Sequence, residues 1–268
     1  MSAYASPILF AVLMWWFLTG AILWLNHRPR HTHAWSFGAM SLALLLALWG
    51  IAATAGAESE ASAYGAFSAA LVVWGWQEMA FYMGYVAGPR RTPGPPSIRG
   101  LARFGAAAAT NLWHEAAIVA GAAAIAWLTA GAPNRIALWT YLVLWGMNLS
   151  ARLNLFLGVR NLHAEFLPEH LRYLGSFFRR APMNALFPVA MLLATGFLLV
   201  LLHPAVTESA SAFKRSGHTM LATLMALAIL EHGFLMLPLP SAALWAWGLP
   251  ARRPPDPDTG PRPAGDIA

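Results

Sequence analysis

Seven apolar stretches, each long enough to form a helix across a bilayer, constrain the fold of this chain more than any other feature. A helix needs about 20 apolar residues to cross the hydrocarbon core. Charged residues make up only 10% of the sequence, whereas a soluble domain carries roughly 25%. We therefore predict an all-α fold, a polytopic membrane bundle of about seven transmembrane helices. The stretches cover residues 6–26, 35–56, 63–87, 104–130, 136–158, 183–203 and 217–238.

Arginines gather in alternate connections and predict the orientation of the bundle. Connections rich in Lys and Arg stay on the cytoplasmic side. The first, third, fifth and seventh stretches are each followed by at least two arginines, whereas the other connections carry Glu58, Glu60 and Glu208 with fewer arginines. The N-terminus is therefore predicted to be periplasmic and the C-terminus cytoplasmic. We interpret these arginines as topology determinants, and we expect no nucleic-acid partner.

Residues 1–249 are predicted to form one transmembrane helical domain. The remaining residues, 250–268, are rich in Pro and Asp, cannot bury enough apolar surface to fold, and are predicted to be a disordered cytoplasmic tail. The chain has no cysteine, which excludes disulfides and thiolate ligands. It also has no phosphate-binding glycine loop and no nucleophile elbow.

Ionisable residues within the apolar stretches are the candidates for a functional site, because charge at membrane depth is costly. At 1.5 Å of rise per residue, Glu78, Glu115 and Glu231 lie roughly 10–16 Å from the cytoplasmic ends of their spans. Arg152 lies at a similar depth. We therefore expect the three carboxylates and Arg152 to share one layer of the bundle.

A polar segment on the cytoplasmic side lies next to this layer. Pro168 can start a helix there, and apolar residues then follow at roughly helical spacing up to Arg180. This pattern predicts an interfacial amphipathic helix over residues 168–180. Glu165 and His170 would point into the bundle, so that the segment covers the polar layer as a lid.

Three interpretations of the polar layer remain open. It can be structural, with Arg152 and amides satisfying the acids, although three acids against one arginine leave charges without a partner. It can be a pocket for a pigment, a haem or a quinone, with histidine as axial ligand. It can also be a carboxylate-bridged di-metal centre of iron, manganese or zinc, although the usual Glu-x-x-His signature is absent. The predicted metal ligands are Glu78, His114, Glu115, Glu165, His170, Glu231 and His232.

Four segments carry a resemblance to a known family. They are "WGWQEMAFYMGYVAGPRR", "NLWHEAAIVAGAA", "FLGVRNLHAEFLPEHLRYLGSFFRR" followed by "PMNALFP", and "LEHGFLMLPLP". In these motifs the chain resembles the PuhE family, photosynthetic complex assembly protein 2 of anoxygenic phototrophic bacteria. The resemblance covers about residues 7–247 and implies a multi-pass protein of the bacterial inner (intracytoplasmic) membrane. It implies no catalytic residue.

Two functions follow as expectations. The resemblance implies a membrane factor in biogenesis and assembly of the photosynthetic reaction centre and core antenna. Its expected partners are their subunits, membrane lipid and the pigment bacteriochlorophyll. The uncompensated acids favour instead a membrane di-metal oxidoreductase acting on a pigment or another lipid-soluble substrate. Whether the protein is an enzyme stays open at this point.

Overall fold

A computed structural model describes residues 3–162, 167–239 and 241–249 of the chain. The predicted tail, residues 250–268, and Glu165 lie outside the described residues. Eight α-helices and two 3₁₀-helices run through the described part, which confirms the all-α bundle. Their bounds are α1 Ala5–Asn26, α2 Arg30–Ala55, α3 Glu60–Tyr82, α4 Gly100–Ala108, α5 Leu112–Leu128, α6 Ile136–Leu157, η2 Glu169–Phe177, α7 Leu186–Val206, α8 Ala212–Phe234 and η3 Ser241–Trp245.

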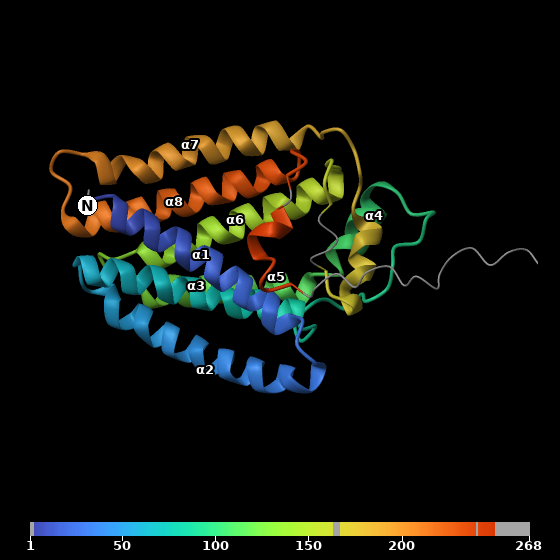
Figure 1. Cartoon of the computed structure of the whole chain (residues 1–268), viewed down its shortest axis with the longest axis horizontal. Coiled ribbons are helices and arrows are strands. Elements are labelled where there is room, and N and C mark those ends of the chain that lie inside the picture. The colour runs from blue at the N-terminus through green and yellow to red at the C-terminus, as the bar shows by residue number, and fades with distance from the viewer. Residues whose placement is uncertain (1–2, 163–166, 240, 250–268) are drawn as a thin grey trace, which may run out of the picture.

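The long helices lie side by side, with α2 and α7 at opposite edges of the bundle and α1, α3, α6 and α8 between them (Figure 1). Helices α1, α2 and α7 are long and apolar enough to cross a membrane. Leucines on α2 and α7, such as Leu45 and Leu192, expose 63% and 75% of their surface. Such exposure of large apolar side chains suits contact with lipid chains and not with water. The protein is therefore a membrane protein.

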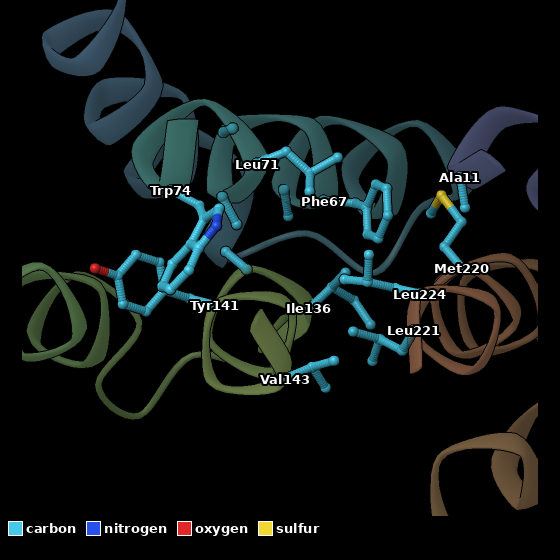
Figure 2. Packing of buried hydrophobic residues seen from close by; sticks show 14 of the residues in the cluster. Ala11, Phe67, Leu71, Trp74, Ile136, Tyr141, Val143, Met220, Leu221 and Leu224 are labelled. Carbon is cyan, nitrogen blue, oxygen red and sulfur yellow. The ribbon is translucent and has the colours of Figure 1, made fainter. Parts of the chain in front are cut away.

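The core lies where α3, α6 and α8 meet. Phe67 and Leu71 of α3 point toward Ile136 of α6 and Leu224 of α8 (Figure 2). Phe67 is fully buried, as is Tyr141 of α6. This core holds together the three helices that carry Glu78, Asn148 and Glu231.

The fourth predicted span, residues 104–130, is wrong as one helix, because it divides into α4 and α5. The segment after α3 crosses the break and satisfies its backbone: Ala87 O accepts from the His114 N–H at 2.8 Å, and Ala109 O accepts from the Arg90 N–H at 3.2 Å. Gly88 permits this approach, since a Cβ there would lie 2.2 Å from Ala109 O. The break is stable because backbone groups at the two helix ends, which have no partner within their own helix, bond to the segment after α3.

A helix is present within the predicted residues 168–180, but it is the 3₁₀-helix η2 and not an α-helix. Its buried residues are Leu171, Leu174 and Phe177. They recur every third residue, which is the repeat of a 3₁₀-helix. Leu171 and Leu174 pack with Phe81 and Ala87, so that η2 covers the end of α3.

Candidate functional site

A cavity of about 370 Å³ opens between α1, α3, α6 and α8. We call it the central cavity. Its size lies within the range of small-molecule sites in proteins. Most of its lining is aliphatic or aromatic, and the polar exceptions are Thr19, Glu78, Asn148, Glu231 and His232. Two of the three predicted carboxylates, Glu78 and Glu231, therefore line one cavity.

Glu78 lies at the boundary between the central cavity and a second cavity of about 260 Å³. The side chain of Glu78 is 14% exposed. The Asn148 side-chain amide donates a hydrogen bond to Oε1 of Glu78 at 3.3 Å. Asn148 lines both cavities too. This pair therefore forms part of the wall that the two cavities share.

His114 packs behind Glu78. Its side chain is fully buried, and its Nε2 lies 3.8 Å from Oε1 of Glu78. Its ring stacks at a tilt on Phe81, with centroids 4.6 Å apart. Among the described residues, neither ring nitrogen of His114 has a hydrogen-bond partner. His114 thus contacts Glu78 without forming a regular hydrogen bond to it.

Glu115 is the carboxylate that Arg152 neutralises. Nη1 of Arg152 lies 2.5 Å from Oε1 of Glu115, and the Trp145 indole donates to Oε2 at 3.4 Å. The guanidinium also lies over the Phe81 ring, 5.3 Å from its centroid. Arg152 belongs to the lining of the second cavity and not of the central one.

Glu231 shares the cavity lining with the indole of Trp15 in α1, and Glu78 acts on the Glu231 carboxyl group electrostatically. The neighbouring His232 is engaged inside the bundle, with Nδ1 2.9 Å from Ala228 O and Nε2 3.0 Å from Ser150 Oγ. Both ring nitrogens of His232 therefore already have partners within the protein.

His170 lies apart from the other predicted ligands. It sits on η2 and lines neither cavity. Burial lowers the pKa of His170 from its ordinary value. Gly84, at φ +80°, makes room for this ring, because a Cβ there would lie 3.1 Å from it. The histidine therefore helps to hold η2 against the end of α3.

The structure thus brings some of the seven predicted metal ligands together and separates others. Glu78, Glu231 and His232 line the central cavity, and His114 lies against Glu78. Glu115 is paired with Arg152, and His170 is on η2. Within the described ranges, no three His, Asp or Glu side chains form a group that could hold a metal ion. The di-metal centre, like the pigment or haem pocket, stays a prediction.

Sequence analysis missed the C-terminal segment that borders the central cavity. The chain turns back after α8, and η3 packs on α1. The Trp16 indole donates to Leu244 O at 2.7 Å, and the Trp245 indole donates to Trp16 O at 3.2 Å. Trp245 also lines the cavity and packs edge-on against Trp15.

A glycine on α1 completes this junction. A Cβ at Gly20 would lie 2.1 Å from the Trp247 ring, so the close approach requires glycine. The only feature of the sequence that could have indicated this contact is the pair of tryptophans in "LWAWG", residues 244–248. Their spacing does not show that they pack on α1, since aromatic residues near the end of a span also form interfacial belts.

Comparison with known proteins gives two matches and one negative result. Residues 1–256 match the family described as "Protein of unknown function (DUF3623)". A Rhodobacter capsulatus protein is 40% identical over 252 residues, which cover 90% of this chain and 89% of that protein. It is described as an uncharacterized 30.4 kDa protein in the puhA 5′ region. No solved structure matches.

Proposed function

This chain belongs to the DUF3623 family, and from that membership we propose that it is an integral-membrane factor in biogenesis of the photosynthetic reaction centre and its core antenna. One observation carries the proposal. The Rhodobacter capsulatus relative, 40% identical, is named for its place in the puhA 5′ region. The puhA gene shares its three-letter prefix with PuhE, the family that the sequence motifs resemble. This is an argument from gene position and not from chemistry.

The surface of the bundle is compatible with such a role. Helices α2 and α7 form opposite edges of the bundle (Figure 1), and both expose large apolar side chains. Trp49 of α2 is 72% exposed, and Leu193 of α7 is 69% exposed. An assembly factor needs lipid-facing surfaces on which the helices of a new subunit can pack, and both edges supply one. Reaction-centre or core-antenna subunits are the partners that we propose for them.

The proposed location is the bacterial inner (intracytoplasmic) membrane, with a periplasmic N-terminus. The arginine distribution supports this orientation. Helices α3, α6 and α8, which hold the polar residues, would then cross the same membrane as α1, α2 and α7. Reporter fusions at residue 57 and at the C-terminus would test the orientation. We expect the fusion at residue 57 to be periplasmic and the fusion at the C-terminus to be cytoplasmic. A periplasmic C-terminus would contradict the proposed orientation.

The second function, a di-metal oxidoreductase acting on a pigment or another lipid-soluble substrate, has weaker support. Glu78 and His114 are neighbours, but two side chains do not complete a di-metal centre. We therefore rank assembly first and leave the metal prediction to direct metal analysis.

A deletion strain tests the proposed function. We expect lower absorption from the assembled reaction centre and core antenna, with restoration by the wild-type gene on a plasmid. The matched control is the same plasmid with an early stop codon. Normal amounts of both complexes in the deletion strain would overturn the proposal.

A further inference from the structure

The central cavity combines two acids with aromatic walls, and the described residues place no basic side chain on it except His232. Both ring nitrogens of His232 are already engaged by Ala228 and Ser150. Arg152, whose side chain is 21% exposed, is bonded to Glu115 and lines the second cavity. The cavity therefore carries acidic groups without a cation of its own.

Among the described residues, no lysine or arginine forms an ion pair with these acids. Asn148 donates to Glu78, and Trp15 lines the same cavity as Glu231. Arg152 acts on Glu78 electrostatically, but its guanidinium is bonded to Glu115. A hydrogen bond from an amide orients a carboxylate but does not cancel its charge. Two carboxylates in an apolar environment are costly unless a positive charge lies beside them. A ligand that supplies this charge would be preferred over a neutral molecule of the same shape.

Five aromatic side chains complete the wall. They come from four elements: Trp15 of α1, Trp74 and Tyr82 of α3, Phe234 of α8, and Trp245 of η3. The faces of Trp and Tyr rings attract cations, and they bind alkylammonium groups better than strongly hydrated ions. Carboxylates and aromatic faces together are the combination that recognises an organic ammonium group.

A metal ion fits this cavity less well than an organic cation. Aromatic rings supply no ligand atoms, and divalent metals need several oxygen or nitrogen donors. The described chain offers no group of three such side chains. By contrast, the aliphatic part of the lining, including Leu18, Ile22 and Leu144, suits a hydrocarbon chain.

We propose that the central cavity binds a lipid-soluble organic cation, an amine or quaternary ammonium group attached to an apolar chain, between Glu78 and Glu231. The volume of about 370 Å³ accommodates an ammonium head with a short chain. The cavity is only partly enclosed, so a longer chain can leave it. Two sources share this chemistry, the amine headgroup of a phospholipid and a free lipid-soluble amine. The inference does not depend on the proposed role in assembly.

Calorimetric titration of the full-length protein in a neutral detergent tests the charge preference. The probe is octyltrimethylammonium, and octanol and octanoate are its neutral and anionic counterparts of equal chain length. Because one charged contact contributes about a factor of ten or more in affinity, we expect at least about tenfold tighter binding of the cation. Equal binding of octanol or octanoate would overturn the inference without any mutation, and so would failure of the cation to bind.

Substitutions locate the charge. Glu78→Gln and Glu231→Gln keep the size of each side chain and its ability to accept a hydrogen bond, and each should weaken cation binding about tenfold. Glu60→Gln is the matched control. Glu60 is also on α3, outside the cavity lining, and accepts a hydrogen bond from Ser216 that glutamine preserves. Unchanged cation selectivity in folded Glu78→Gln and Glu231→Gln would overturn the site.

Lipid retention separates the two sources. The protein is reconstituted in vesicles of phosphatidylethanolamine and phosphatidylglycerol and then examined by native mass spectrometry. Retained phosphatidylethanolamine that octyltrimethylammonium displaces identifies a lipid headgroup as the ligand. Cation selectivity without retained lipid identifies a free amine. Retention of phosphatidylglycerol that resists the cation would contradict the charge preference. These binding results do not depend on the deletion strain. Normal photosynthetic complexes in that strain would overturn the proposed function and leave the cation site untouched.

Discussion

Glu78 of α3 and Glu231 of α8 line the same cavity, although neither forms an ion pair with an arginine or lysine that the structure describes. Arg152 acts on Glu78 only electrostatically. The third carboxylate of the predicted layer, Glu115, is bonded to Arg152. The shortage of positive charge that the sequence indicated is therefore localised at one cavity. This difference between the three acids leads to different expectations for each of them.

Breaking the Arg152–Glu115 pair should destabilise the bundle. The two side chains are 21% and 29% exposed, so solvent offsets part of the loss. We expect Arg152→Gln to lower the free energy of unfolding by about 1–3 kcal/mol, below the 3–5 kcal/mol typical of a fully buried pair. Arg152→Gln combined with Glu115→Gln should recover much of this loss. Thermal unfolding in detergent measures the stability of both variants. If the stability losses of the two single substitutions simply add in the double variant, the two side chains are not coupled.

Gly121 should not tolerate a side chain. A Cβ there would lie 2.5 Å from the Tyr141 hydroxyl, which donates to Ile118 O at 3.0 Å. Because Tyr141 is fully buried, Gly121→Ala should cost about 1–3 kcal/mol through overpacking. Adding Tyr141→Phe removes the clashing oxygen and should restore part of the stability. Gly146→Ala is the control, since open space surrounds that glycine. Equal melting temperatures for the two alanine variants would contradict this packing.

The docking of η2 should weaken in acid. Burial lowers the pKa of His170 below its ordinary value of 6.5. The unfolded chain therefore binds this proton more readily than the folded one, and stability is lost as pH falls through about 6.5. Between pH 7.5 and 5, the melting temperature of wild type should fall more than that of His170→Gln. His31→Gln, at an exposed histidine, is the control. Parallel pH profiles for wild type and His170→Gln would exclude this effect.

Metal analysis distinguishes two uses of the carboxylates. A di-metal centre would retain about two equivalents of iron, manganese or zinc, and Glu231→Ala or Glu115→Ala would release them and lower thermal stability. An organic-cation site requires no metal. We expect metal below one equivalent, because Glu115 is bonded to Arg152 and both ring nitrogens of His232 already have partners. Elemental analysis of protein purified without chelators measures it, and two equivalents would restore the di-metal prediction.

Sequence reasoning was most successful where a local property decides the structure. The length and apolarity of each stretch place the long helices close to their observed bounds, because a helix satisfies its own backbone in a membrane. The exceptions need a partner elsewhere in the chain. The break between α4 and α5 requires Gly88 and Ala87 from the segment after α3. The 3₁₀ form of η2 requires packing on Phe81.

The sequence by itself determined which ionisable residues lie within apolar helices, because the apolar stretches can be located from their length and composition. It also showed that these residues need a reason, since a charge at membrane depth raises the free energy. It could not determine how they pair. Arg152 could have neutralised Glu78 or Glu115, and helix rotation and packing bring it to Glu115. It also could not reveal that Trp245, far along the chain, returns to Trp15 and closes one side of the cavity. Pairing and enclosure arise from non-local contacts, and only the tertiary structure decides them.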